Sequence, residues 1–324
     1  MIPDKKLNLT LLGIDGSYSL NDLSKIPQSK LSFYRDRDRT IRFSSSSLRA
    51  HLFMERIVNH GSYGNLVSAN RIADGSIVPV MVKIPRLSEM NLTQEAIIQS
   101  LCYSHLKSQG ASWAIPQVYD IFLKDGKPCF SMDQIKGKTV LEWFEASKTP
   151  DHDFFLLMAQ LSLLLWSLET HLNIDHRDLK ADNILIKEGP ILLSISTWTL
   201  ECPFQVILLD FGFACLGSLV NLGDGVLPVM DPCPKEGRDL FQLLVSLLHL
   251  KSFTKHLSLA TKEKITRWLS VGSKSYAPIA ERWSPESWVY LITSQKDFSS
   301  SNSSPIQILT TLISEIPGHL SKTS

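Results

Sequence analysis

The sequence predicts an α+β chain whose first part is rich in β-strands and whose second part is mainly helical. From Arg56 to about Phe130, short apolar runs are broken by Gly, Asn and Asp, a pattern typical of an antiparallel sheet. From Val140 onward, long apolar stretches with helical periodicity dominate, among them 153–171 and 237–249. The 324 residues, 44% of them hydrophobic, are enough to bury one large core or two smaller ones.

Two turns and one helix can be placed within the first part. Residues 73–75 (Ala-Asp-Gly) and 124–127 (Lys-Asp-Gly-Lys) have the composition of hairpin turns. Between them, apolar residues recur at helical spacing from 92 to 106, and Asn91 with Gln94 can cap the start of this helix. The first part is therefore expected to be a sheet with one inserted helix.

The two ends of the chain have a different composition. Residues 1–50 are expected to be an extension, in which the alternating charges of 35–39 favour a solvated linker over a docking or phosphorylation segment. The serine-rich run 299–304 predicts a flexible segment, followed by a last helix from 306 to 316. The longest uncharged apolar stretch, 154–168, is too short for a membrane span of about 20 residues and predicts a buried helix.

Charge and cysteine usage limit the partners and the compartment. The net charge of +1 gives no general attraction to nucleic acid or to a membrane, so neither is expected as a partner. The five cysteines are scattered and lack C-x-x-C spacing: Cys102, Cys129, Cys202, Cys215 and Cys233. They are predicted to be reduced thiols of an intracellular protein, in the cytoplasm or the nucleus. The first ten residues hold no apolar stretch, so a secretory signal is not expected.

One short segment carries the strongest functional signal. His176-Arg177-Asp178-Leu179-Lys180-Ala181-Asp182-Asn183 matches every fixed position of the motif H-R-D-L-x-x-x-N. By this match the chain resembles the eukaryotic-type protein kinase superfamily, and Lys180 resembles the serine/threonine type. The resemblance implies that Asp178 accepts the proton of the attacking hydroxyl and that Lys180 offsets charge on the transferring phosphoryl group. It also implies that Asn183 binds Mg²⁺.

The segment downstream of this motif supports the same resemblance. Residues 206–209 predict a buried strand, which ends in Asp210-Phe211-Gly212 and resembles the D-F-G of kinases. Asp210 is expected to chelate the Mg²⁺ that bridges the β- and γ-phosphates of ATP, with an unrelated strand-end turn as the alternative. Asp239 resembles the buried aspartate that ties down the catalytic-loop backbone, and an ordinary helix cap is its alternative.

A segment upstream of this motif is expected to cover the nucleotide phosphates with its backbone. Residues 59–66 resemble the loop G-x-G-x-x-G-x-V, with Asn59 in place of its first glycine and Leu66 in place of its valine. Glycine lets the backbone approach phosphates closely, and Asn tolerates positive φ better than other residues. A plain hairpin turn is the alternative. The residues expected to cover the phosphates are Val58, Asn59, His60, Gly61, Ser62, Tyr63, Gly64, Asn65 and Leu66.

A lysine is expected to bind the nucleotide from the sheet. Lys83 ends the run 80–83 (Val-Met-Val-Lys), which resembles the V-A-I-K of kinases, and its ammonium is expected to pair with the α- and β-phosphates. Glu95, on the helical face shared with Ile98 and Cys102, is the expected partner of Lys83, and Glu89 is the alternative.

The strand at 129–135 is expected to lead into the adenine site. By position, Met132 is expected to lie at the entrance of the pocket behind the adenine. The Asp133 carbonyl and the Ile135 amide are expected to form hydrogen bonds with the edge of the adenine. This assignment rests on position alone, because a backbone role permits almost any side chain. An ordinary strand end is the alternative.

Three departures separate the chain from the family pattern. No Ala-Pro-Glu follows the D-F-G, which puts the usual platform for protein substrates in doubt. Between Cys215 and Arg238 the only hydroxyl side chain is Ser218, so activation is expected either without loop phosphorylation or through Ser218 alone. Residues 191–200 predict a β-rich insertion, in which Trp198 closes a small satellite core rather than marking a docking surface.

Together these features predict a bilobal kinase-like fold. The predicted function is the Mg²⁺-dependent transfer of the γ-phosphate of ATP to Ser or Thr hydroxyls of proteins. The expected parts are an extension (1–50), a β-rich N-lobe (51–135), a mainly helical C-lobe (136–295) and a tail (296–324). A nucleotide-binding pseudokinase and a small-molecule or lipid kinase are the rival functions. Some features resemble kinases of large DNA viruses or haspin-like kinases, so a viral origin is one option.

Overall fold

The computed structural model describes residues 7–8, 17–18, 34–35, 40–44, 49–60, 64–73, 75–86, 92–217, 233–295, 298 and 301–323. The chain divides into two compact units. Unit 1 comprises 1–101 and 116–135, and unit 2 comprises 102–115 and 136–324. The predicted α+β class is confirmed, with a β-rich first unit and a mainly helical second unit.

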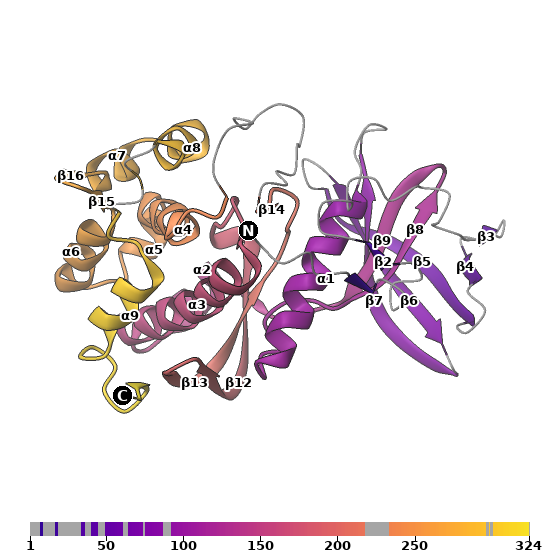
Figure 1. The fold of residues 1–324 in the computed structure, drawn as a ribbon, viewed down its shortest axis with the longest axis horizontal. Coiled ribbons are helices and arrows are strands. Elements are labelled where there is room, and N and C mark those ends of the chain that lie inside the picture. Colours follow the sequence, from indigo (N-terminus) through magenta and orange to yellow (C-terminus); the bar gives the residue numbers. More distant parts are fainter. Residues whose placement is uncertain are drawn as a thin grey trace. The chain divides into compact units, whose positions relative to one another are not determined.

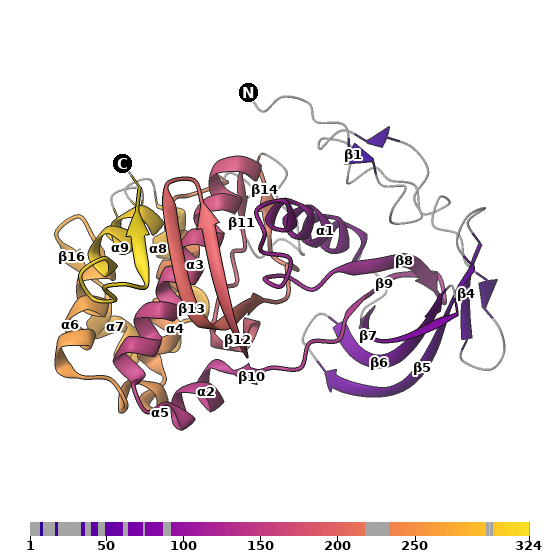
Figure 2. The same ribbon diagram turned by 90° about the horizontal axis from the view of Figure 1, so that it is seen from below.

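Unit 1 is built around an antiparallel sheet of seven strands in the order β3-β4-β5-β6-β7-β9-β8. Figure 2 labels the strands of this sheet from β4 to β9. The strands are β3 (Tyr34–Arg35), β4 (Thr40–Ser44), β5 (Arg49–His60), β6 (Gly64–Ala73), β7 (Ser76–Pro85), β8 (Val118–Lys124) and β9 (Lys127–Asp133). A separate pair joins β1 (Leu7–Asn8) to β2 (Ser17–Tyr18). Both predicted hairpin turns are confirmed, because Ala73 pairs with Ser76 and Lys124 pairs with Lys127.

The core of unit 1 follows from alternation along these strands. Side chains point to opposite faces at successive positions, so residues two apart share a face. Such pairs are buried on neighbouring strands: Leu52 and Met54, Val67 and Ala69, Val80 and Val82, joined by Phe122 and Cys129. The predicted inserted helix is also confirmed as α1 (Leu92–Ser108), while the expected cap residue Asn91 lies outside the described residues.

Unit 2 consists mainly of helices (Figure 1). They are α2 (Val140–Ala146), α3 (Pro150–Leu172), α4 (Arg238–His249), α5 (Lys251–Thr254), α6 (Leu259–Trp268), α7 (Ala277–Arg282), α8 (Glu286–Ser294) and α9 (Pro305–Leu312). Short strand pairs join β11 (Ile174–Asp175) to β14 (Cys215–Leu216) and β15 (Ser270–Val271) to β16 (Lys274–Ser275). The expected helices at 153–171 and 237–249 correspond to α3 and α4.

Helix α3 is the central helix of this unit. By length and composition it could cross a membrane, but 78% of its most apolar 18-residue window is buried inside the protein. The buried helix predicted for 154–168 is thus confirmed. Helix α9 and the strand β13 pack against α3.

The predicted β-rich insertion is the distal part of a long hairpin. Strands β12 (Ile184–Ile195) and β13 (Trp198–Leu208) pair along their length, with a bulge between Glu188 and Ile191 (Figure 1). Strands β10 (Lys138–Thr139) and β17 (Leu320–Lys322) complete this sheet on either side. Trp198 is 2% exposed, and Lys322 Nζ lies 5.2 Å from its ring centroid. This burial confirms the satellite-core interpretation of Trp198.

The serine-rich run near the end is expected to be flexible, but the serines of this run that the structure describes are packed inside unit 2. Ser301, Ser303 and Ser304 are buried, and Ser303 Oγ donates a hydrogen bond to Gly237 O at 3.0 Å. A serine can satisfy its hydroxyl on nearby backbone, so polar composition alone does not imply exposure. The predicted last helix is present as the shorter α9, and the strand β17 after it was not predicted.

We predict that Gly237→Ala lowers the free energy of unfolding by roughly 2 to 4 kcal/mol, through left-handed strain and overpacking. Gly237 has φ +77°, and an added Cβ would lie 2.7 Å from Ser303 C. Gly318, with φ +82° and nothing within 4 Å of its Cβ position, is the matched control. Urea denaturation should show a loss of only about 1 to 2 kcal/mol for Gly318→Ala. Equal losses at the two positions would contradict the predicted clash.

Candidate active site

The catalytic-loop segment follows β11 and is fixed by one aspartate of α4. Asp239 accepts a hydrogen bond from His176 N at 2.7 Å and another from Arg177 N at 2.8 Å. Arg177 is fully buried and adopts a left-handed φ of 64°. The predicted role of Asp239, which was to tie down this backbone, is confirmed.

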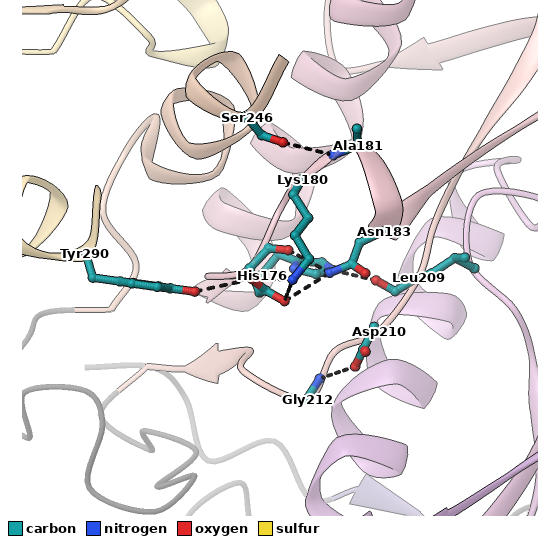
Figure 3. A network of polar contacts seen from close by, with 10 residues as sticks. His176, Lys180, Ala181, Asn183, Leu209, Asp210, Gly212, Ser246 and Tyr290 are labelled. Atoms are coloured by element: carbon teal, nitrogen blue, oxygen red, sulfur yellow. Dashed lines mark hydrogen bonds and ion pairs between the residues drawn. The ribbon is translucent and has the colours of Figure 1, made fainter. Parts of the chain in front are cut away.

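The carboxylate of Asp178 accepts hydrogen bonds from three side chains, Lys180, Asn183 and Tyr290, which Figure 3 labels. Lys180 Nζ is 3.2 Å from Asp178 Oδ1 and 2.9 Å from Oδ2, so the two form an ion pair. Asn183 Nδ2 donates to the Asp178 carbonyl at 2.8 Å and to Oδ2 at 3.1 Å. Tyr290 of α8 donates its hydroxyl to Oδ1 at 3.2 Å. No motif or spacing in the sequence indicates Tyr290, which lies 112 residues from Asp178 along the chain.

The two predicted metal ligands come from adjoining segments. Leu209 N donates to Asn183 O at 2.9 Å, and His176 Nε2 lies 2.8 Å from Leu209 O. These contacts place the residue before Asp210 against the end of the catalytic loop. The Asp210 carboxylate is exposed, and its Oδ1 accepts from Gly212 N at 3.2 Å.

The donor atoms of this pair fit a hard cation. Because Asn183 Nδ2 is bonded to Asp178, the amide oxygen of Asn183 remains as the atom that can bind a metal. A carboxylate and an amide oxygen are ligands that Mg²⁺ accepts, with water and phosphate oxygens filling the other positions. Magnesium binding itself stays a prediction.

Unit 1 carries the predicted sheet lysine on β7. Lys83 Nζ lies 2.6 Å from Glu95 Oε1, and both side chains are buried. The expected ion pair with Glu95 is therefore present, whereas Glu89 lies outside the described residues. A Cβ added at Gly64 would lie 3.3 Å from Lys83 Cε and Cγ, so this glycine leaves room for the lysine stem. Binding of a nucleotide by Lys83 stays a prediction.

The other expected nucleotide residues of unit 1 lie at strand ends. Val58, Asn59 and His60 end β5, and Gly64, Asn65 and Leu66 begin β6, with His60 paired to Asn65. The three residues between these strands in the sequence, Gly61, Ser62 and Tyr63, lie outside the described residues.

The strand expected to lead into the adenine site is β9. Met132 Sδ accepts a hydrogen bond from Gln99 Nε2 of α1 at 3.5 Å. The Asp133 side chain accepts from Gln117 N at 2.8 Å and from Tyr119 Oη at 2.5 Å, and Ile135 is half-buried just after the strand. The adenine contacts expected of the Asp133 carbonyl and the Ile135 amide stay predictions.

Three buried carboxylates lie behind the catalytic loop. Glu169, Asp175 and Asp239 each place an oxygen within 4.8 Å of the other two. Burial, together with the charges of Asp175 and Asp239, raises the pKa of Glu169 well above its usual value. Burial and Asp239 also raise the pKa of Asp175 to about 7, opposed by the guanidinium groups of Arg238 and Arg177. Arg238 Nη1 lies 3.5 Å from Asp175 Oδ2, so an arginine offsets part of the negative charge of this cluster.

The prediction that all five cysteines are reduced is wrong, because Cys215 and Cys233 form a disulfide. The pairing of β11 with β14 places Cys215 opposite Asp175, while Lys235, two residues after Cys233, donates its N–H to Asp175 Oδ2 at 2.8 Å. The disulfide thus joins two segments that Asp175 already holds together. Spacing along the sequence could not reveal this proximity.

The remaining cysteines, Cys102, Cys129 and Cys202, are free and buried. Burial raises the pKa of Cys129 and Cys202 to about 12 and raises that of Cys102 further, so these thiols stay protonated. Disulfides persist mainly in oxidising compartments, so the Cys215–Cys233 bond weakens the argument for an intracellular location. That location stays a prediction.

Comparison with known proteins agrees with the motifs. The chain is 26% identical over 250 residues to the serine/threonine-protein kinase Nek8 of Danio rerio, a match that covers 71% of this chain and 32% of that protein. It is 39% identical over 85 residues to a probable serine/threonine-protein kinase of Dictyostelium discoideum, which covers 26% of this chain and 5% of that protein. No family model matches the chain.

These similarities support a protein-kinase-like superfamily for this chain. The chain matches about a third of the length of the zebrafish kinase and a twentieth of the Dictyostelium one. The narrower resemblance to large-DNA-virus or haspin-like kinases stays a prediction. Ser218, through which one of the two expected modes of activation would act, lies outside the described residues.

The carboxylate cluster predicts a pH dependence of stability in the kinase-like chain. Burial raises the pKa of both Glu169 and Asp175 in the folded state, so the unfolded chain releases protons that the folded chain retains, and the free energy of unfolding falls as pH rises above about 5. Glu169→Gln mimics the protonated group and should raise stability at pH 8 by about 1 kcal/mol or more. Urea denaturation at pH 5 and pH 8 measures both effects. Glu145→Gln, a change at an exposed glutamate of α2, should leave the slope unchanged. An unchanged slope in Glu169→Gln would contradict the prediction.

The disulfide leads to a separate prediction. When the chain is unfolded and alkylated in the absence of reductant, only the three free cysteines should be modified. After reduction, mass spectrometry should find all five cysteines modified. Cys215→Ser should lower the free energy of unfolding by about 3 kcal/mol, because the bond closes a loop of 18 residues. Five modified cysteines without reductant would rule out the bond.

Proposed function

We propose that this chain transfers the γ-phosphate of ATP to serine or threonine hydroxyls of proteins in a Mg²⁺-dependent reaction. The observation that carries the proposal is the network around Asp178, in which a fixed carboxylate is bonded to both Lys180 and Asn183. The weak similarity to serine/threonine kinases supports the same reaction. A phosphoryl transfer of this kind needs positioning and charge compensation more than covalent chemistry.

Asp178 would act on the acceptor. Its carboxylate would orient the substrate hydroxyl and take its proton as the oxygen attacks phosphorus. The backbone that carries Asp178 is held by Asp239, and its side chain is held by Asn183, so little reorganisation is needed. Lys180, whose side chain is 44% exposed, could move its ammonium from Asp178 to the transferring phosphoryl group and offset the charge that grows there.

Asn183 and Asp210 would hold the Mg²⁺ through the amide oxygen of one and the carboxylate of the other. The bound ion would supply neutralisation of the phosphate charge. Lys83, oriented by Glu95, would bind the α- and β-phosphates from unit 1, with the ends of β5 and β6 covering them. The adenine would be bound by the backbone of Asp133 and Ile135, with Met132 beside the pocket behind it. The proposal requires that both units act on one nucleotide.

The proposed substrates are proteins, and neither nucleic acid nor a membrane is proposed as a partner. Lys180 in the catalytic loop favours serine or threonine acceptors. Two rival functions are separable by experiment: a scaffold that binds nucleotide without turnover, and a kinase of small molecules or lipids.

We predict that the purified chain labels serine or threonine of casein or histone when given Mg²⁺ and γ-labelled ATP. Asp178→Asn should lower kcat at least about a hundredfold, because general-base catalysis contributes on that order. Asp182→Asn changes an exposed aspartate of the same loop and should leave kcat within about twofold. Phosphoamino-acid analysis identifies the acceptor.

Three outcomes would count against this function. ATP binding without transfer under any condition would indicate a scaffold, and transfer to a small alcohol or a lipid but not to protein would indicate the other rival. Equal activity of wild type and Asp178→Asn would contradict the role of the aspartate.

A further inference from the structure

The hydroxyl of Tyr290 bonds directly to the carboxylate proposed to activate the substrate. Among the described residues, three side chains donate to Asp178: Lys180 contacts both oxygens, Asn183 contacts Oδ2, and Tyr290 contacts Oδ1 at 3.2 Å (Figure 3). An ionised carboxylate accepts about four hydrogen bonds. These contacts therefore fill the carboxylate, and an incoming hydroxyl has to take the place of Lys180 or of Tyr290 on Oδ1.

The proposed reaction gives a further role to two of these three donors, Lys180 and Asn183, and none to Tyr290. Lys180 would turn toward the transferring phosphoryl group, and Asn183 would stay on Asp178 while its oxygen binds the metal. Neither task requires the position on Oδ1 that Tyr290 holds. A general base must lie within about 3.2 Å of the oxygen whose proton it takes, and the phenol oxygen lies at that distance. The Tyr290 hydroxyl thus has the contact that an acceptor hydroxyl needs.

Helix α8 is anchored so that Tyr290 reaches this position. Val289 and Thr293, one turn apart, bury one face of the helix. At the helix C-terminus, Lys235 Nζ donates to Thr293 O at 2.7 Å and to Gln295 O at 3.2 Å, an arrangement that the helix dipole also favours. The backbone N–H of Lys235 bonds Asp175, which directly precedes the catalytic loop. One residue therefore ties α8 to the segment that carries Asp178.

We propose that Tyr290 occupies the acceptor position on Asp178 and competes there with the substrate hydroxyl, so that the chain carries its own competitor for the acceptor. This inference rests on the proposed function. An intramolecular competitor has a fixed effective concentration and is displaced as substrate binds. It therefore raises the KM for protein substrate and leaves kcat and the KM for ATP nearly unchanged.

A purely structural role for Tyr290 predicts the opposite sign. If the phenol orients Asp178 for catalysis, removing its hydroxyl leaves the carboxylate less well positioned and lowers kcat. The two roles are therefore distinguished by the direction of the change and by the kinetic constant that moves.

The test is Tyr290→Phe, which removes the hydroxyl and keeps the ring. The KM for casein should fall about tenfold, equivalent to about 1.4 kcal/mol, with kcat and the KM for ATP within twofold. Tyr276→Phe is the matched control, because Tyr276 is a buried tyrosine of the same unit whose ring packs on Phe241. It should leave the KM unchanged. An unchanged or raised KM in Tyr290→Phe, or a lower kcat, would overturn the inference while the kinase function stands.

A second variant removes the hydrogen bonds from Lys235 Nζ that hold the C-terminus of α8. Lys235→Met removes the donor that holds the end of α8 and should lower the KM for casein in the same direction as Tyr290→Phe. The double variant should show no further decrease, because both changes release the same contact. Additive effects of the two changes would overturn the proposed link between the anchor and the tyrosine.

The contact can also be measured without activity. In a chain labelled with ¹³C at tyrosine Cζ, the resonance missing from Tyr290→Phe belongs to Tyr290, and it should shift in Asp178→Ala. No shift would overturn the inference. A shift together with a complete absence of phosphate transfer in all variants would instead refute the proposed function and the competition that depends on it. Phosphate found on Tyr290 of the active chain would make it an acceptor, and would also overturn the inference.

Discussion

The position of every proposed catalytic group in unit 2 depends on the pair of hydrogen bonds that Asp239 accepts from His176 N and Arg177 N. Arg177 needs this support because its left-handed φ of 64° is unfavourable for a residue with a Cβ. Asp239 lies in the first turn of α4, where the helix dipole stabilises a carboxylate. The start of α4 is held in turn by the contact of Gly237 with Ser303. Residues far apart in the chain thus fix the loop that presents Asp178.

The same region has to accommodate an unusual amount of buried charge. Arg177 and Arg238 are each 1% exposed, and Asp175 and Asp239 are fully buried beside them. Buried charges are tolerated only when they are paired, and removing one partner leaves the other costly to bury. Burial and the neighbouring carboxylates raise the pKa of Glu169, which favours its neutral form and limits the negative charge of this group. The catalytic loop therefore rests on a balanced ionic layer rather than on an apolar one.

The residues that the sequence predicted well are those whose partners are close in the chain or fixed by a motif. Asp178, Lys180 and Asn183 fall within one short loop, and Lys83 and Glu95 belong to consecutive elements, so their spacing is informative. Tyr290, Glu169 and the disulfide partners meet only through packing over long separations, which periodicity does not encode. Ser303 was misjudged because a polar residue can be buried when backbone groups satisfy it.

The pairing of β17 with β13 has a consequence for synthesis of the chain. Leu320 pairs with Leu200, so the β10-β12-β13-β17 sheet of unit 2 is incomplete until the residues near 320 have been made. The described strands of unit 1 all lie before residue 135. Domains tend to fold in the order of their translation, and contacts between distant residues form slowly. The β-rich unit can therefore fold while the chain is still growing, whereas the sheet of the helical unit is completed only after residues 320–322 have been made.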